Sequence, residues 1–393
     1  MNKYLVLFVI LWSMQASAQY PVKIQVFEDF PVNFKGEKRD TSEVIMFQGG
    51  RLIFKRIEAP VFEEGTDVQV KMTLKSAGDP WDKSGSLFVI TDPEKINLMD
   101  IARGKKEYPA TSGVLEKYPG IRKSENYTPP LEILRFMTPF GVGYFSDEEK
   151  NPRIKYNRPV YVPKWEDKVV WEQDISALAQ EVTGDFYLGL WLDTWTNEGY
   201  IVDVSLEYSG RPKTKREVIP LVNTVYYAGQ EYPDLFAFTD LNVEFELPEN
   251  AKNAKLHYIT TGHGGHNGGD EFIKIRNKVT LDGKVVIDTI PWRDDCASFR
   301  RFNPSSGVWT RKDTAYAYVD GEKELIAVKE RLASSDLSRS NWCPGSKVEP
   351  IIAELGALEE GKYKLSIHIP ATPIDGDKLN HWLVSAYLTY EKK

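Results

Sequence analysis

Apolar and polar residues alternate with a period of two along much of this chain. The alternation is clear at residues 68–74 and 202–208, and again at residues 243–247 and 365–369. Because successive side chains of a strand point to opposite faces, this pattern predicts half-buried antiparallel strands. Asp282-Gly283 lies between two apolar runs and predicts a tight hairpin turn.

Helical periodicity is scarce in the same sequence. A short helix is expected at residues 174–182, with Asp174 as its cap, and a second one at residues 327–337. Many short strands, together with 28 Gly and 23 Pro, are typical of β-sandwiches or jelly rolls and not of a parallel α/β fold. We therefore predict an all-β protein.

The length of 393 residues leads us to expect two or three domains. A polar, basic stretch directly after a predicted strand indicates a linker at residues 211–217, between an N-terminal domain at 19–210 and a C-terminal domain at 218–393. Residues 92–130 and 146–168 lack clean periodicity, so we expect two long surface insertions in the N-terminal domain. Long excursions are uncommon in compact domains and are often functional.

Residues 1–18 are typical of an export signal, with a charged start, an apolar stretch and Ala-Ser-Ala at 16–18. We expect this signal peptide to be cleaved and the protein to be periplasmic or secreted. No later stretch is apolar enough to cross a bilayer, so we expect no integral membrane segment. Cys296 and Cys343 are the two cysteines. Outside the cytosol such a pair is most simply a disulfide, with two free thiols as the alternative.

Charge composition limits the class of partner. The chain has 50 Lys and Arg against 57 Asp and Glu, which gives a net charge of -7. Nucleic-acid binding depends on cations that neutralise phosphates. We therefore expect no nucleic-acid partner.

Two segments carry a carboxylate beside tryptophan. Residues 79–82 (Asp-Pro-Trp-Asp) lie at a predicted strand connection, where an acid could be a general base or nucleophile beside an aromatic wall, although turn chemistry alone explains an Asp there. In residues 191–195 (Trp-Leu-Asp-Thr-Trp), strand periodicity would place Trp191, Asp193 and Trp195 on one face. Such a face suits a carbohydrate, but two tryptophans on a strand are also common in a core.

Two further segments could carry chemistry. Residues 263–272 (His-Gly-Gly-His-Asn-Gly-Gly-Asp-Glu-Phe) contain two carboxylates, and His263 and His266 could bind a metal, but no helix aligns them and we expect no metal site. The segment lacks the Lys-Ser or Lys-Thr of a phosphate loop, which disfavours nucleotides. In residues 339–345 (Arg-Ser-Asn-Trp-Cys-Pro-Gly) an arginine lies close to Cys343. The segment could be simply a loop held by a disulfide, or it could position the arginine to bind a carbonyl or carboxylate.

Taken in order, these blocks resemble the peptide-N-glycosidase F family, amidases that remove N-linked glycans from asparagine. The blocks are Trp81-Asp82, Leu-Arg-Phe-Met-Thr-Pro-Phe at 134–140, Asp-Thr-Trp at 193–195 where the family has Glu-Thr-Trp, the Gly-rich segment ending in Glu271, and Arg339 with Trp-Cys-Pro-Gly at 342–345. The last block, which matches the family's Arg-x-x-Trp-Cys-Pro-Gly, is the most specific. The resemblance runs from about residue 68 to near the C-terminus.

The resemblance implies two side-by-side, eight-stranded antiparallel jelly rolls with the active site in the cleft between them. It implies catalytic roles for three acids, Asp82, Glu271 and Asp193. It also implies substrate binding by Trp81, Lys83, Trp195, Arg339 and Trp342, and a disulfide between Cys296 and Cys343. We expect no cofactor.

The chain departs from the family pattern at several of these positions. Lys83 stands where the family has Arg and loses the planar fork that binds an oxygen bidentately. Asp193 replaces a longer Glu, and Phe272 replaces a Trp. The family's other disulfides are absent, including the one that flanks the second carboxylate, so Asp270 is a rival to Glu271.

The leading hypothesis is hydrolysis of the amide between asparagine and the first N-acetylglucosamine of N-glycoproteins or glycopeptides, by a monomer. In this hypothesis Asp82 activates water, Glu271 orients it or shares its proton, and Arg339 with Lys83 stabilises charge on the amide oxygen. Asp193 holds the sugar. The alternatives are a two-carboxylate glycosidase and a non-catalytic glycan-binding jelly roll. Copper chemistry is disfavoured because well-spaced His and Met ligands are lacking.

Overall fold

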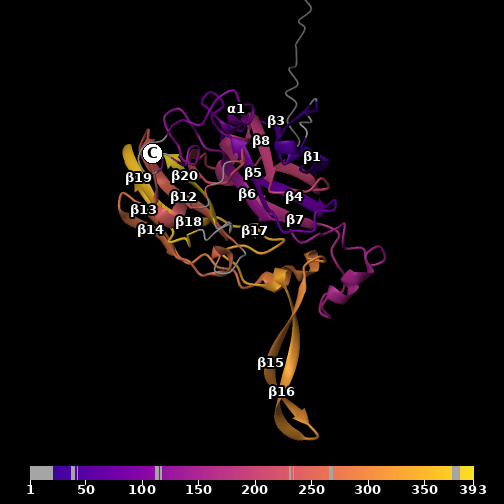
Figure 1. Cartoon of the computed structure of the whole chain (residues 1–393). Helices are drawn as coiled ribbons and strands as arrows, with labels where there is room; N and C mark the ends of the chain where they lie inside the picture. The colour runs from indigo at the N-terminus through magenta and orange to yellow at the C-terminus, as the bar shows by residue number, and fades with distance from the viewer. Residues whose placement is uncertain are drawn as a thin grey trace, which may run out of the picture.

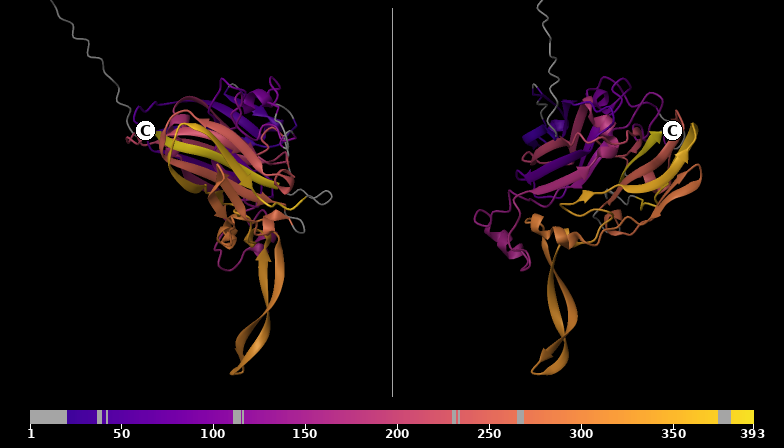
Figure 2. Two further views of the ribbon diagram at one scale, coloured as in Figure 1. Left: turned by 90° about the vertical axis from the view of Figure 1, so that its left-hand side faces the viewer. Right: turned by 180° about the vertical axis from the view of Figure 1, so that it is seen from behind.

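Two β-sandwiches lie side by side, and a two-stranded ribbon extends away from both of them (Figures 1 and 2). The computed structural model describes residues 21–36, 40–41, 43–110, 115, 117–229, 232, 234–264, 269–373 and 381–393. Within these residues no helix is long and apolar enough to cross a membrane.

The first sandwich is built from a four-stranded and a six-stranded sheet. The four-stranded sheet has the order β1 (Val22–Val32), β9 (Tyr200–Tyr208), β4 (Val68–Ser76), β7 (Val169–Asp174). The six-stranded sheet has the order β17 (Lys347–Val348), β6 (Leu131–Met137), β5 (Ser84–Ile90), β8 (Gly184–Leu192), β3 (Leu52–Ala59), β2 (Val44–Phe47). The alternation predicted for residues 68–74 is confirmed, because the apolar side chains of β4 are buried and its polar ones face outward.

The second sandwich contains two four-stranded sheets within the described residues. One has the order β10 (Glu217–Asn223), β20 (His381–Lys392), β12 (Ala251–His263), β18 (Ile351–Leu358). The other has the order β11 (Leu241–Leu247), β19 (Gly361–His368), β13 (Asn277–Leu281), β14 (Lys284–Thr289). Neighbouring strands pair antiparallel throughout, so the predicted all-β architecture with two antiparallel sandwiches is confirmed.

Local turns explain several of these elements. Asp282-Gly283 joins β13 to β14 with positive φ at both residues, 47° and 79°, so the predicted hairpin turn is confirmed. The short helix expected at 174–182 is present as the 3-10 helix η4 (Ser176–Val182), and the carboxylate of Asp174 accepts a hydrogen bond from the backbone N–H of Ser176 at 2.9 Å. The N-cap position itself is held by Ile175 and not by Asp174 as expected, so Asp174 binds the first helical residue from one position further upstream.

The remaining helices are short and lie in connections. They are η1 (Gln48–Gly50), α1 (Leu98–Ala102), η3 (Pro152–Asn157), α2 (Leu235–Phe238), η5 (Asp270–Phe272), η6 (Cys296–Phe302) and η7 (Ser334–Asp336). The helix expected at 327–337 is wrong, because those residues form most of strand β16 (Glu322–Ala333), followed by η7. Strand β16 pairs along its whole length with β15 (Val308–Val319).

The segment at 92–130 is more than a surface insertion. It carries α1, and then Leu115, Tyr118 and Ile121 bury their side chains in the core of the second sandwich. The backbone N–H of Asn223 donates to the Ile121 carbonyl (2.9 Å), and the N–H of Lys123 donates to the Leu221 carbonyl (2.8 Å), so this segment adds to the second sandwich. The segment therefore crosses the boundary between the sandwiches, although it belongs to the first half of the chain.

A buried ion pair also joins the two sandwiches. Arg135 on β6 donates from Nε and Nη2 to the two carboxylate oxygens of Glu132, at 2.6 and 2.7 Å. Its Nη1 donates to the backbone carbonyl of Leu383 on β20 (2.9 Å) and to the hydroxyl of Thr261 on β12 (3.2 Å). Both charged side chains are fully buried. One guanidinium therefore binds both sandwiches.

Cys296 and Cys343 form the expected disulfide, and both are fully buried. They are 47 residues apart in the sequence, and the loop that they close contains the whole of the β15–β16 ribbon. A covalent link across a loop of this size restricts the unfolded chain. The disulfide therefore joins the segment before β15 to the segment after β16, at the base of the ribbon.

Arg135→Met should destabilise the protein by about 3 to 5 kcal/mol, because it leaves the buried Glu132 carboxylate without its cation. Urea unfolding of the purified protein measures this loss. Arg56→Met is the matched control: Arg56 pairs with Asp185 on the surface, where both side chains are more than half exposed, and such pairs contribute less than about 1 kcal/mol. Equal, small losses in the two variants would contradict the structural role of Arg135.

Candidate active site

The turn at residues 79–82 is organised by a buried carboxylate. Asp79 is fully buried, and its Oδ1 accepts a hydrogen bond from the backbone N–H of Trp81 at 3.0 Å. Its Oδ2 accepts from the hydroxyls of Thr194 (2.7 Å) and Thr196 (3.3 Å), which follow β8. Asp79 is therefore a structural residue that ties the turn to the loop after β8.

Two more side chains hold the backbone on either side of Asp82. Thr138, which follows β6, accepts the backbone N–H of Lys83 with its hydroxyl at 2.8 Å, and its own N–H donates to the Lys83 carbonyl at 2.8 Å. The hydroxyl of Tyr200 donates to the Trp81 carbonyl at 2.7 Å. The block at 134–140 thus supports the turn, and the Asp82 side chain remains 20% exposed.

Arg339 brings carboxylates from the two halves of the chain together. Its Nε donates to Glu271 Oε1 at 2.8 Å, its Nη2 lies 3.9 Å from Asp82 Oδ2, and its Nη1 donates to the Leu337 carbonyl at 2.8 Å. The Glu271 side chain is 13% exposed, whereas the Arg339 side chain is only 1% exposed. The substrate-binding role expected for Arg339 stays a prediction, and in this structure its guanidinium is almost fully buried. It lies beneath the two acids and positions them.

Trp342, which the sequence predicts as a substrate contact, is a buried side chain in this structure. Its ring is 2% exposed, and its Nε1 donates to the carbonyl of Gly262 at 2.9 Å. The guanidinium of Arg339 lies 4.8 Å from the centre of the Trp342 ring and 5.1 Å from that of Phe272. The two rings replace water around the cation. The Trp-Cys-Pro-Gly block therefore acts on the site through Arg339.

Asp270, the rival to Glu271, points away from this cluster. It is fully buried and accepts hydrogen bonds from Trp382 Nε1 at 2.7 Å and from the backbone N–H of Thr372 at 3.1 Å. Its neighbour Glu271 is the acid that meets Arg339. The two successive carboxylates thus have different surroundings, one structural and one in the site.

The structure describes one of the two histidines considered as metal ligands. His263 is buried, hydrogen-bonds the hydroxyl of Thr261 through Nε2 (2.8 Å) and stacks on His381 and Trp342. His266 lies outside the described residues. Among the residues that the structure describes, no three His, Cys, Asp or Glu side chains gather in a way that would hold a metal ion.

Asp193 lies one residue beyond the end of β8, in the loop that Asp79 anchors. Its carboxylate accepts from Trp195 Nε1 (3.0 Å), from the hydroxyl of Tyr226 (3.0 Å) and from Arg51 Nη1 (3.3 Å). Because β8 ends at residue 192, the strand face predicted for Trp191, Asp193 and Trp195 does not form. Trp191 is in the core, whereas Trp195 is 52% exposed and stacks on Arg51.

Burial and charge set the protonation of the acids. Burial raises the pKa of the Asp82 carboxyl, although the cations of Arg339 and Lys83 act in the opposite direction. Burial raises the pKa of Glu271 to about 7, where Arg339 opposes the shift and Asp82 adds to it. Burial also raises the pKa of Asp193, again against the effect of Lys83. Lys83 thus acts on both Asp82 and Asp193, and the backbone N–H of Asp193 donates to the carbonyl of Ser84 at 3.0 Å, which brings the two segments side by side.

Sequence reasoning missed two side chains that hold Asp193. Arg51 follows Gly49-Gly50 at the start of β3, and Tyr226 lies in the connection after β10. Neither belongs to a motif at a fixed spacing from Asp193. The pairing of β3 with β8, in which Leu52 lies opposite Trp191, is what brings Arg51 to this position.

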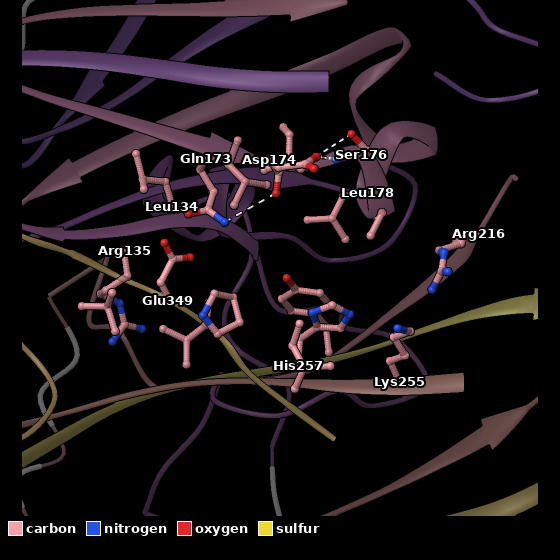
Figure 3. A pocket seen from close by; sticks show the side chains of 18 of the residues that line it. Leu134, Arg135, Gln173, Asp174, Ser176, Leu178, Arg216, Lys255, His257 and Glu349 are labelled. Carbon is pink, nitrogen blue, oxygen red and sulfur yellow. Dashed lines mark hydrogen bonds between the residues drawn. The ribbon is translucent and has the colours of Figure 1, made fainter. Parts of the chain in front are cut away.

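A separate cavity of about 440 Å³ lies between the sandwiches and is lined by none of the predicted site residues (Figure 3). Its lining includes Lys255, which is paired with Glu354 at 2.7 Å, and Arg216, which is paired with Glu391 at 3.4 Å. Burial lowers the pKa of His257 in its wall to about 4. The carboxylate cluster around Arg339 is therefore the better candidate for chemistry.

Comparisons with known proteins identify the family of this chain. Family models for the N-terminal and C-terminal domains of peptide-N-glycosidase F match residues 23–208 and 231–389. Two solved structures of PNGF-II are similar, with 31% and 32% identity and TM-scores of 0.82 and 0.81. These alignments cover 95% of this chain and 65% and 66% of the PNGF-II chains, so the chain spans about two-thirds of their length.

A more distant match supports the fold. PNGase F from Flavobacterium meningosepticum, described as a glycosylasparaginase, is 15% identical with a TM-score of 0.59, and the alignment covers 95% of this chain and 96% of that one. A search of curated proteins found no match. The two family models together span most of both sandwiches and include Asp82, Asp193, Glu271 and Arg339. The chain therefore belongs to the peptide-N-glycosidase F family.

Proposed function

We propose that the protein hydrolyses the amide bond between an asparagine side chain and the first N-acetylglucosamine of an N-linked glycan. The observation that carries this proposal is the contact of one buried cation, Arg339, with two partly exposed carboxylates, Asp82 and Glu271, that come from different sandwiches. Membership of the peptide-N-glycosidase F family supports the choice of bond. Two acids with different surroundings suit a reaction that both removes and supplies a proton.

In the proposed reaction water adds to the carbonyl carbon of the asparagine side chain. The bond from that carbon to the sugar-bearing nitrogen then breaks. The peptide keeps an aspartate, and the nitrogen leaves with the glycan as a glycosylamine after taking up one proton. The glycosylamine later loses ammonia in water. One water molecule is consumed, and no other reactant is needed for this step.

Asp82 is the proposed base. Burial raises the pKa of Asp82, but the cations of Arg339 and Lys83 favour its ionised form, and its side chain is exposed enough to reach a water molecule. Lys83 is only partly buried, so its ammonium can approach the amide oxygen as negative charge develops there. Arg339 is fully buried and acts by fixing the relative positions of the two carboxylates.

Glu271 is the proposed source of the proton for the departing nitrogen. With a pKa of about 7, a substantial fraction of its carboxyl groups is protonated at neutral pH. Asp82 contributes to that raised pKa, so the negative charge of the base favours the protonated form of the acid. This arrangement divides the two tasks between the two carboxyl groups.

The sugar is proposed to lie against the exposed tryptophans. Trp81 is 57% exposed beside Asp82, and Trp195 is 52% exposed beside Asp193. Aromatic rings stack on the apolar faces of sugars, and a carboxylate accepts hydrogen bonds from hydroxyl or amide groups. Asp193 is oriented by Trp195, Tyr226 and Arg51, which suits a binding role better than proton transfer.

We further propose that the protein acts outside the cytosol, in the periplasm or after secretion. The signal-like composition of residues 1–18 supports this location. The disulfide between Cys296 and Cys343 adds a second, independent reason, because such bonds persist in oxidising compartments. N-linked glycoproteins would be encountered there.

Incubation with an N-glycopeptide should yield a glycan-free peptide about 1 Da heavier than its asparagine form, because the amide NH2 is replaced by OH. Asp82→Asn should lower the rate by about 100-fold or more, since the proton acceptor is lost. Mass spectrometry measures both. Asp185→Asn, a change in an exposed surface acid, should keep the wild-type rate. A retained N-acetylglucosamine would indicate a glycosidase, and binding without turnover a glycan-binding protein; either result would reject the proposal.

The stability of the protein should report the raised pKa of Glu271. A carboxyl group whose pKa is about 7 when folded, against an ordinary value of 4.5, binds its proton more tightly in the folded state. This stabilisation is present below pH 4.5 and is lost as the pH rises through 7. Wild type should therefore lose unfolding free energy relative to Glu271→Gln between pH 5 and 8, as measured by urea unfolding.

Glu172→Gln provides the control for this pH series. A hydrogen bond from Lys71 lowers the pKa of Glu172, so its contribution is present above its ordinary value of 4.5 and is lost only at lower pH. The difference between wild type and this variant should stay constant from pH 5 to 8. If Glu271→Gln gives the same flat difference, the pKa of Glu271 is not raised and it cannot supply a proton near neutrality.

A further inference from the structure

The β15–β16 ribbon extends away from both sandwiches (Figures 1 and 2). Each strand has 12 residues, which corresponds to a length of about 40 Å at about 3.4 Å per residue. In the described structure the two strands pair only with each other, so their outer edges are open. An isolated two-stranded ribbon is marginally stable in water. Its presence therefore calls for a function.

The register of the ribbon separates its charges by sign. Tyr316 lies opposite Leu325, and Lys312 lies opposite Lys329, so these four side chains share one face with every second residue along each strand. We call this the basic face; its charged residues are Lys312, Lys323, Lys329 and Arg331, and it carries no acid. The acidic residues Asp313, Glu322, Glu324 and Glu330 belong to the opposite face, which we call the acidic face.

Exposed aromatic side chains accompany the cations of the basic face. Tyr316 and Tyr318 are 70% and 76% exposed, and the ammonium of Lys323 lies 4.6 Å from the centre of the Tyr316 ring. Lys312 and Lys329 form no ion pair with any residue that the structure describes. Charges of either sign on either face would protect open strand edges from aggregation. Protection from aggregation does not require positive charges on one face and negative charges on the other.

Both ends of the ribbon lead into the candidate active site. Before β15, the hydroxyl of Ser305 donates to the carbonyl of Pro80, two residues before Asp82, at 2.9 Å. After β16, the chain passes through η7 and reaches Arg339, which holds Asp82 and Glu271. The base of the ribbon therefore lies near the two proposed catalytic acids, and a molecule bound along the ribbon can extend from them.

We propose that the basic face binds an acidic, extended polypeptide segment that flanks the glycosylated asparagine of the substrate. This inference rests on the proposed function, because it assigns the ribbon to the polypeptide part of a glycoprotein whose glycan occupies the site. An extended segment can pair with an open strand edge and place every second side chain over Lys312, Lys323 and Lys329. The exposed tyrosines add apolar contact.

Charge distribution favours a single polypeptide strand over a larger anionic surface. A bilayer or a nucleic acid presents many negative charges, and the acidic face of a ribbon only two strands wide would repel them. The whole chain, with its net charge of -7, would repel them as well. A single strand needs only one face. Since an extended chain spans about 3.3 to 3.6 Å per residue, an acidic tract within about a dozen residues of the asparagine can reach the ribbon.

A binding experiment tests this proposal without using catalysis. The probe is a fluorescent, unglycosylated 12-residue peptide of alternating Glu and Thr, compared with a Gln and Thr version. The wild-type chain should bind the Glu peptide about tenfold more tightly at low salt, since three exposed ion pairs together correspond to about that factor. The preference should weaken at high salt. The triple variant Lys312→Glu, Lys323→Glu, Lys329→Glu should lose it.

The acidic face supplies the matched control. Asp313→Lys, Glu322→Lys, Glu324→Lys reverses the same number of charges on the same ribbon and should retain the preference for the Glu peptide. Equal affinity of wild type for the two peptides, or equal loss in both triple variants, would overturn the proposal. Binding to anionic phospholipid vesicles that depends on the three lysines, without peptide preference, would assign the face to a membrane instead.

Kinetics with two glycopeptides link the ribbon to the site. For a glycopeptide with the Glu-Thr tract, the lysine triple variant should raise KM about tenfold with kcat unchanged, and for a Gln-Thr glycopeptide both constants should match those of wild type. An equal KM change for both glycopeptides would overturn the docking role. If wild type cleaves neither glycopeptide, the proposed function is wrong, and the binding experiment still decides whether the basic face takes an acidic strand.

Discussion

The buried guanidinium of Arg135 is the interaction on which the rest of the structure depends. Burying a charge is costly unless its partners are complete, and Arg135 has a bidentate carboxylate on its own strand and two oxygen acceptors on the second sandwich. Strand β6, which carries it, continues into Thr138 and the support of the Asp82 turn. Strand β12, which it contacts at Thr261, continues towards Glu271. A shift at this contact would separate the two acids.

A second buried guanidinium then sets the chemistry of the site. Arg339 is as deeply buried as Arg135, but its carboxylate partners are partly exposed, and one of them lies 3.9 Å away. Arg339 therefore lowers the pKa values of Asp82 and Glu271 without cancelling the effect of burial. The result is a pair of carboxyl groups with different proton affinities, held by an arginine whose side chain is only 1% exposed. The ribbon that ends near Arg339 extends the same site towards the polypeptide.

Sequence periodicity predicted the fold because alternation and Asp-Gly turns are local signals, as at residues 68–74 and at Asp282-Gly283. The helix predicted at 327–337 failed for a local reason as well. Apolar residues there fit a helix as well as a strand, and the deciding signal was a second turn, Asp320-Gly321, with positive φ at both residues. The sequence could not show which side chains of the site would be buried. The motifs predicted Arg339 and Trp342 as substrate-binding residues, and only the packing reveals that both side chains are almost fully buried.

The central claim is that the bond broken joins the carbonyl carbon to the nitrogen of the asparagine side chain. Hydrolysis of a glycopeptide in water labelled with oxygen-18 tests this most directly, with the released peptide weighed before any exchange. The account predicts a peptide about 3 Da heavier than its asparagine form, because aspartate adds about 1 Da and the labelled oxygen about 2 Da. An unlabelled peptide that retains its asparagine, with the label found only on the released sugar, would contradict it.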